Sequence, residues 1–340
     1  MGLKEYVFSR LLLTPVMVLI LLSIVFVLMR VLPGDPVTML EGKNIPEDVL
    51  ARRRAELGLN KPLYQQYVDY IYSVFVRFDL GYTALERIPV SYLIATRFPA
   101  TVELAVASTV VAVAIGVALG VLTARYPSAS VKTLVRVYSS IVYSIPVFYI
   151  GMLLQLTASK GLGLPTTGRL SPINLLALDS LPYRTGFVVV DSILAGRPDI
   201  ILDFLAHLTL PALALGLYLS GVFTRVTYLA VEESMSQEYV RAARSRGIRE
   251  WGVVLRYGLR NAMIPLLTMG GLQVAALLGG AVLTETTFNW DGLGLLVYEG
   301  ILKRDYAIVQ GTVTIYAVIV ALVSLLVDIA YAYVDPRVRY

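Results

Sequence analysis

The sequence predicts an all-α polytopic membrane protein with six transmembrane helices. Of its 340 residues, 57% are hydrophobic and only 16% are charged, whereas a soluble domain carries about 25% charged residues. A transmembrane helix needs about 20 mostly apolar residues, and six stretches of the chain meet that requirement. We therefore expect a helical bundle in lipid, with an extracytoplasmic domain between the first and second spans.

The expected spans follow one another along the whole chain. They are Leu11–Met29, Val102–Ala124, Thr133–Thr157, His207–Ala230, Met263–Thr284 and Ile308–Val334. The first run is longer than the roughly 7–15 apolar residues of a signal peptide, and no cleavage pattern follows it. We therefore expect it to remain as a span. Pro146 is expected to kink the third span, because proline removes a helical hydrogen bond.

The composition also excludes several kinds of site. With no Cys and a single His, His207, the chain offers neither a disulfide framework nor a cysteine-based or histidine-rich metal site. The net charge of +5 could favour nucleic acid or anionic lipid. We find no basic helix interleaved with aromatic residues, so membrane lipid is the expected partner and nucleic acid is not. No metal or cofactor is expected to bind the chain directly.

The loops predict the domain organisation and orientation. We expect the N-terminus and first helix at 1–32, an extracytoplasmic domain at 33–100, and five helices with their loops at 101–340. The N-terminus, the loop 231–262 and the C-terminus share one side and are short and densely basic. Cytoplasmic segments near span ends carry an excess of Lys and Arg, so we expect both termini and this loop in the cytoplasm. The apolar patch Phe187–Leu194 is expected to form a lid or strand on the outer face.

The loop 231–262 has helical periodicity on both sides of Gly247. The spaced residues are Tyr239, Ala242, Ala243 and Arg246 before it, and Val253, Val254 and Tyr257 after it. This pattern predicts two short amphipathic helices broken at a glycine that takes a positive φ. Such a basic protrusion could be a docking element for another protein. It could equally be a helical hairpin attracted to anionic headgroups.

The same segment resembles the signature loop of binding-protein-dependent ABC importers, which reads Glu-Ala-Ala, three residues, then Gly. Ala242, Ala243 and Gly247 match, while Arg241 stands where the family has Glu. The longer strings Tyr239-Val-Arg-Ala-Ala-Arg-Ser-Arg-Gly247 and Leu259-Arg-Asn-Ala-Met-Ile-Pro265 are similar to the dipeptide/oligopeptide/nickel permeases. So is Glu285-Thr-Thr-Phe-Asn-Trp-Asp-Gly-Leu-Gly294, with Asp291 in place of the usual Pro.

This resemblance implies a B-type permease subunit with the type I importer core. It also implies a C-type permease partner, two ATPase subunits that use ATP and Mg, and an extracytoplasmic binding protein that delivers peptides. Oligosaccharides or nickel are the alternative substrates. The loop 231–262 would be the coupling helix, with Arg241, Ala242, Ala243 and Gly247 facing the ATPase. The chain has no phosphate-binding loop motif, so we expect it not to be an enzyme.

Polar residues at membrane depth are candidate functional groups, because they are unfavourable in lipid. Gln155 and Gln273 are candidates for the translocation path, while Glu103 and Asp328 are more simply explained by hydrogen bonds between helices. Gly116 and Gly120 form a GxxxG pair, which is typical of close helix packing. A stand-alone secondary transporter and an intramembrane enzyme are competing interpretations of the sequence. The first would need internal inverted repeats, and the second a nucleophile with a base.

Overall fold

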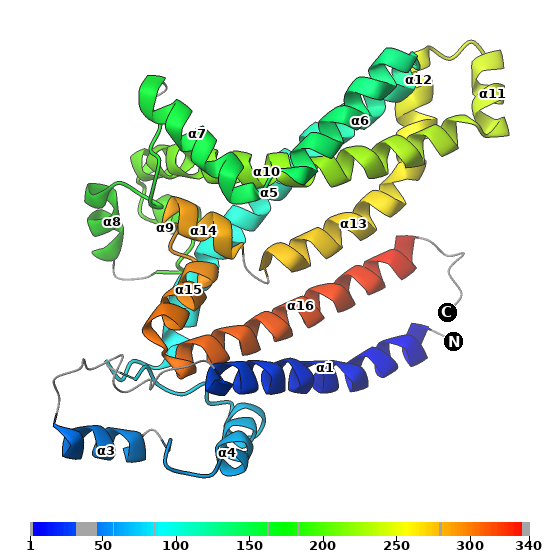
Figure 1. Ribbon diagram of the computed structural model, residues 1–340. Coiled ribbons are helices and arrows are strands. Elements are labelled where there is room, and N and C mark those ends of the chain that lie inside the picture. Colours follow the sequence, from blue (N-terminus) through cyan, green and yellow to red (C-terminus); the bar gives the residue numbers. More distant parts are fainter. Residues whose placement is uncertain are drawn as a thin grey trace.

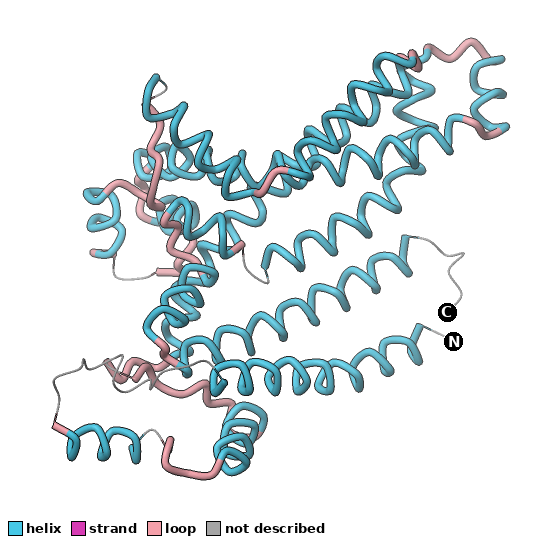
Figure 2. Tube along the Cα trace, viewed as in Figure 1, coloured by secondary structure: helices cyan, strands magenta, loops and turns pink. Residues whose placement is uncertain are grey.

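The computed structural model describes residues 3–31, 46–56, 58–84, 86–161, 163–181, 184–278 and 281–334. Within these ranges the regular elements are helices, and an isolated antiparallel bridge joins Tyr82 to Pro89. The helices form an open, elongated assembly in which α1 and α16 run side by side (Figure 1). The tube in Figure 2 shows how short the connections between most of them are.

Five helical segments are long and apolar enough to cross a membrane. Four of them are single helices, α1 (Leu3–Val31), α5 (Val90–Arg125), α10 (Pro198–Met235) and α16 (Tyr306–Val334). The fifth is α13 (Arg260–Leu278), which continues from α12 (Glu250–Val253) and a π-helical turn, η1 (Val254–Leu259). These segments confirm the all-helical membrane fold. The expected boundaries of several spans were wrong.

The expected third span is two helices rather than one kinked helix. α6 (Ala129–Ser144) and α7 (Val147–Gly161) meet at an angle of 97°. Ile145 between them adopts extended backbone angles, φ −81° and ψ 129°. Proline disfavours the helical conformation in the residue before it, so Pro146 ends α6 outright. A sixth crossing exists only if this bent pair is counted as one span.

The loops that flank the other spans also contain helices. α10 begins at Pro198, well before His207, because proline suits the first helical turn. His207 lies inside α10, buried, with its Nδ1 2.9 Å from the Asp203 carbonyl oxygen. The patch expected as a lid or strand is the helix α9 (Val188–Leu194), which follows α8 (Pro172–Asp179). The fifth span ends at Leu278, and α14 (Val282–Phe288) and α15 (Leu293–Lys303) follow.

The α5–α10 interface forms the centre of the fold, and glycine makes it possible. A Cβ at Gly120 would lie 2.5 Å from Thr227, and one at Gly216 would lie 2.6 Å from Val111. A Cβ at Gly116 would overlap Phe223 in the same way. Small residues let helix backbones approach where lipid supplies no hydrophobic driving force. The packing interpretation of the GxxxG pair is confirmed.

The carboxylate of Glu285 organises the start of α15. It is fully buried, accepts a hydrogen bond from the Thr101 hydroxyl at 2.9 Å and another from the Leu295 backbone N–H at 3.0 Å. A Cβ on Gly292 would lie 2.5 Å from the carboxylate, and one on Gly294 would lie 2.9 Å away. A negative charge at a helix N-terminus is stabilising, so Glu285 supports the start of α15. Gly292 and Gly294 leave the space that its carboxylate needs. Asp291, which replaces the family's Pro, pairs with Arg97.

Between α1 and α5 the structure describes two short helices, α3 (Glu47–Glu56) and α4 (Leu63–Phe75). α4 packs on α1, where the Ser23 and Tyr67 hydroxyls are 2.7 Å apart and Val74 contacts the buried Leu22. α1 begins and α16 ends on the side from which α11 and α12 project, whereas α3 and α4 lie at the opposite end (Figure 1). The side chain of Asp328 lies outside the described residues.

Candidate functional site

A helical hairpin, residues 238–253, projects from one end of the bundle (Figure 1). It consists of α11 (Glu238–Ser245), a turn at Gly247 and α12. Gly247 has φ +75°, in the left-handed region, and no atom would lie within 4 Å of a Cβ there. Glycine is the residue that adopts this conformation without strain. The predicted pair of short helices broken at this glycine is confirmed.

The hairpin has a small apolar core of its own. Val240, Ala243 and Val253 are buried, and Met235 and Tyr257 pack against them. The predicted helix face was therefore only partly right. Ala243 points inward together with Val240, while Ala242 and Arg246 are exposed. The reason is that α12 folds back on the Val240 side of α11, a contact that periodicity within one helix does not determine.

One ion pair holds the two arms of the hairpin together. Arg244 donates to the Glu250 carboxylate at 2.7 and 3.3 Å, and this hydrogen bond raises the pKa of the Arg244 guanidinium. Arg241, at the position of the missing Glu, pairs with Glu238 on the exposed surface at 3.0 Å. Of the predicted contact residues, Arg241, Ala242 and Gly247 are exposed and accessible to another protein. Ala243 is buried in the apolar core of the hairpin.

The base of the hairpin is fastened to the spanning helices. The π-helical turn η1 packs on α10, where a Cβ on Gly258 would lie 3.2 Å from Val231. Asn261 at the start of α13 donates to the Tyr239 hydroxyl at 2.6 Å. The guanidinium of Arg125, at the end of α5, lies 5.7 Å from the centre of the Trp251 ring. A force applied to the hairpin would reach α5, α10 and α13 together, because packed side chains transmit rigid-body movement.

The two glutamines proposed from sequence lie on different helices. Gln155 on α7 donates to the backbone oxygens of Thr166 at 2.8 Å and Thr287 at 3.0 Å, so its amide ties α7 to α14. Gln273 is half-buried on α13, and its side chain makes no hydrogen bond to any described residue. Gln273 therefore keeps a free amide, whereas that of Gln155 is engaged in holding the fold.

Glu103 forms an ion pair with Arg169, whereas the sequence predicted only a hydrogen bond between helices. Its carboxylate accepts from Arg169 Nε at 3.0 Å and Nη2 at 2.5 Å, and from the Val188 N–H at 2.7 Å. The side chain of Arg169 is 14% exposed and that of Glu103 is 10% exposed. Hydrogen bonding by Glu103 was expected, but Arg169 as its partner was not. Arg169 lies in an irregular segment, and no sequence periodicity connects it to α5.

Comparison with protein families matches nearly the whole chain. Residues 116–340 match the family described as "Binding-protein-dependent transport system inner membrane component". Residues 3–105 match "Binding-prot-dependent transport system membrane comp, N-term". The chain belongs to this family. It is a permease subunit of a binding-protein-dependent ABC importer and a multi-pass membrane protein.

Curated relatives cover almost the full length of the chain. The dipeptide transport system permease protein DppB of Escherichia coli K12 is 39% identical over 317 residues, 93% of each chain. The di/tripeptide transport system permease protein DppB of Pseudomonas aeruginosa UCBPP-PA14 is 40% identical over the same share of each. The glutathione transport system permease protein GsiC of Escherichia coli O6:H1 is 36% identical over 337 residues, 99% of each. These matches favour a permease subunit over a stand-alone transporter.

Proposed function

We propose that this permease forms half of the translocation pathway for short peptides in an ATP-driven importer. Three relatives of 36–40% identity are named for dipeptides, di/tripeptides or glutathione, which is itself a short peptide. Import of oligosaccharides or nickel by the same machinery is less well supported, since none of these names refers to them. The test is uptake of a radiolabelled dipeptide into proteoliposomes that hold ATP inside and are supplied with the binding protein outside. Glutathione, an oligosaccharide and Ni²⁺ serve as competitors.

The assembly that fits this role contains four kinds of protein. A C-type permease completes the pathway, two ATPase subunits hydrolyse ATP with Mg, and an extracytoplasmic binding protein delivers the peptide. The permease itself does no chemistry on ATP. Both termini and the hairpin are cytoplasmic in this arrangement, and α3 and α4 belong to the extracytoplasmic domain. Co-purification of the chain with an ATPase tests the assembly, and its failure in a mild detergent would count against it.

The observation that supports coupling is the exposed tip of an otherwise rigid hairpin. Ala242 has no large side chain and lies on the outer side of α11, so a groove on an ATPase can approach the backbone there. Ala243, one residue on, is buried in the hairpin core. Arg241 is paired with Glu238, but the exposed Arg246 adds positive charge near the turn, which complements an acidic groove.

Two substitutions at neighbouring alanines separate docking from folding. Ala242→Tyr fills the space that the partner needs but leaves the hairpin core intact. We expect normal membrane insertion and thermal stability, loss of ATPase co-purification, and at least tenfold slower ATP-driven uptake. Ala243→Tyr overpacks the core and should lower stability itself, because overpacking commonly costs about 1–3 kcal/mol. Wild-type uptake in Ala242→Tyr would contradict the proposed docking surface.

We also assign Gln273 to the translocation path, and we assign Gln155, on a different helix, a role in holding the fold. The free amide of Gln273 can hydrogen-bond a peptide group in transit, whereas the amide of Gln155 is already bonded to two carbonyls. Gln273→Leu is expected to slow peptide uptake severalfold without loss of stability. Gln155→Leu is expected to lower the stability instead. Equal effects of both changes on uptake and stability would overturn the distinction.

A further inference from the structure

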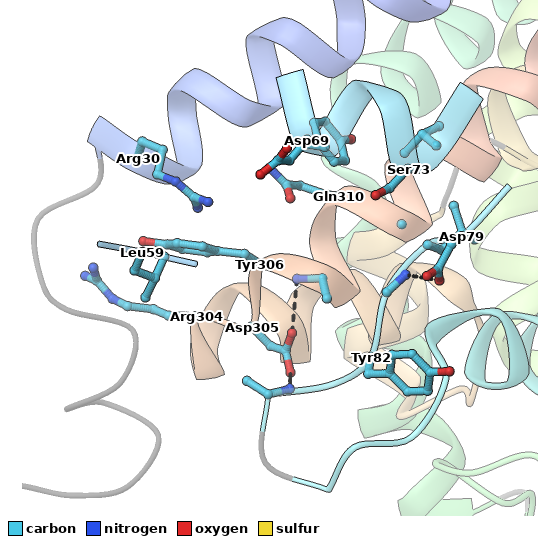
Figure 3. A pocket seen from close by; sticks show the side chains of 17 residues that line it. Arg30, Leu59, Asp69, Ser73, Asp79, Tyr82, Arg304, Asp305, Tyr306 and Gln310 are labelled. Carbon is cyan, nitrogen blue, oxygen red and sulfur yellow. Dashed lines mark hydrogen bonds between the residues drawn. The ribbon is translucent and has the colours of Figure 1, made fainter. Parts of the chain in front are cut away.

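A cavity of about 260 Å³ with several charged side chains in its walls lies at the end of the bundle opposite the hairpin. Its walls come from three regions far apart in the sequence: the end of α1, residues 59–84 with helix α4, and residues 304–311 at the start of α16 (Figure 3). None of its lining residues belongs to the hairpin, and neither Gln155 nor Gln273 reaches it. The proposed coupling and transport functions therefore leave this cavity unexplained.

Most charges around the cavity are separated. The exception is Asp69, which lies beside Gln310 in Figure 3 and whose Oδ2 accepts from Lys61 Nζ at 2.7 Å. In Figure 3, Arg30 and Arg304 lie on one side, and Asp79 lies on the other beyond Gln310. Asp305 is not part of this separation, because its two oxygens accept from the N–H groups of Ala84, Ala307 and Ile308. Asp79 uses one oxygen for the Gly81 N–H at 2.8 Å and has its second oxygen available.

Two buried donors face the cavity without an acceptor. Gln310 is only 7% exposed, and its Nε2 has no hydrogen-bond partner among the described residues. The same holds for the buried Nη1 of Arg30, although its Nε donates to Gln66 at 2.9 Å. Buried donors in proteins nearly always have a partner, so these two point to an acceptor supplied by a bound molecule.

On the side of the spanning helices, the cavity is bounded by tightly packed residues. Its inner side is formed by Val74, which is 8% exposed, and by Gly311, where a Cβ would lie 2.7 Å from Val90. Two apolar grooves lie nearby, one between α1 and α4 and one between α1 and α16, but neither shares a lining residue with the cavity. A phospholipid would need an apolar path from its headgroup to its acyl chains. The cavity shares no lining residue with either apolar groove, so it offers no such path. This favours a small water-soluble ligand.

We propose that this cavity binds a small zwitterion of amino-acid or dipeptide size. The carboxylate would accept hydrogen bonds from Arg30 Nη1 and Gln310 Nε2, and the ammonium group would lie against Asp79. Its volume holds about nine groups of the size of water, at about 30 Å³ each, which corresponds to two small residues. The site is peripheral to the proposed path, and its existence does not depend on which solute crosses the membrane.

The experiment is calorimetric titration of the full chain, purified with its associated subunits in phosphatidylcholine nanodiscs, without a binding protein. The probe is glycylglycine, compared with N-acetylglycylglycine, which lacks the ammonium group, and glycylglycinamide, which lacks the carboxylate. We expect saturable binding of glycylglycine and at least tenfold weaker binding of either capped form. Absence of saturable binding to the wild type would overturn the proposal.

Variants locate the binding within the molecule. Gln310→Leu and Asp79→Asn should each weaken glycylglycine binding at least tenfold, while the remote exposed Arg197→Met should leave it unchanged. Thermal unfolding of each variant distinguishes lost binding from lost folding, and Arg30→Lys, which keeps the charge, should retain part of the affinity. Binding that all these variants preserve would place the ligand elsewhere and refute the site. Binding of glycerophosphoethanolamine but not glycylglycine would identify a headgroup site instead and contradict our assignment.

Discussion

Gly247 illustrates how a single residue controls the geometry of the hairpin. Its left-handed φ of +75° turns the chain between α11 and α12, while the space around it is open. A side chain there would be disfavoured by backbone conformation rather than by a clash. L-residues in this region cost about 1–2 kcal/mol, and β-branched residues fit it worst. The direction of the turn, and with it the presentation of Ala242, depends on this conformation.

We therefore expect Gly247→Val to uncouple uptake from ATP hydrolysis while membrane insertion stays intact. Gly247→Asn is the matched control, because asparagine tolerates the left-handed region far better. It should retain most of the activity. Uptake and ATPase rates measured side by side in proteoliposomes provide the check. Equal activity of the two variants would show that φ at this position does not matter.

The buried Glu285 carboxylate has a comparable role at the start of α15. Replacing Gly292 by Ala would bring a Cβ within 2.5 Å of this carboxylate. We expect Gly292→Ala to lower the thermal unfolding temperature clearly. Gly161→Ala is the control, because nothing lies within 4 Å of its Cβ position and its φ is not positive. Fluorescence-monitored unfolding in detergent checks both, and equal unfolding temperatures would refute the packing argument.

At the scale of elements, the Glu103–Arg169 pair joins α5 to the segment before α8. Both groups are largely buried, and removing one partner of a buried ion pair leaves an uncompensated charge, at a cost of about 3–5 kcal/mol. In the described residues 163–181 and 184–187, the structure is irregular apart from α8. The placement of this segment against α5 therefore depends strongly on this ion pair.

A double-mutant cycle tests that dependence. Arg169→Met should destabilise the protein markedly, since it leaves the Glu103 carboxylate unpaired. Adding Glu103→Gln should recover part of the loss, because the remaining amide is neutral and can still accept from the Val188 N–H. Thermal stability of the wild type, both single variants and the double variant measures the coupling. Strict additivity of the two changes would mean that the pair contributes nothing specific.

At the scale of the whole molecule, the two ends of the bundle differ in character. The hairpin projects at one end, where α1 begins and α16 ends, and α3 and α4 lie at the other (Figure 1). Residues of α4 line the cavity there. An importer needs this polarity, because the binding protein and the ATPases contact opposite faces of the membrane. The positive charges of the hairpin favour its cytoplasmic placement.

The natural absence of cysteine makes this orientation directly measurable. Arg246→Cys on the hairpin and Arg197→Cys at the opposite end both place a thiol at an exposed position. In intact cells, or in spheroplasts where an outer membrane exists, a membrane-impermeant maleimide should label only the Arg197→Cys variant. Both should react after the membrane is opened. Labelling of Arg246→Cys in intact cells would reverse the orientation and remove the basis of the coupling role.

Composition and local pattern were enough to predict the membrane class, most of the spans, the glycine break in the hairpin and the family. These features depend on contacts within a few residues or on the requirement of lipid for apolar helices. The 97° break at Pro146, the inward face of Ala243, the Arg169 partner of Glu103 and the charge-separated cavity did not follow from the sequence. Apart from the break, each arises where separate segments pack against one another, and periodicity within one segment does not determine that packing. At Pro146 the sequence indicated a distortion, but only the packing of α6 and α7 on α10 determined its angle.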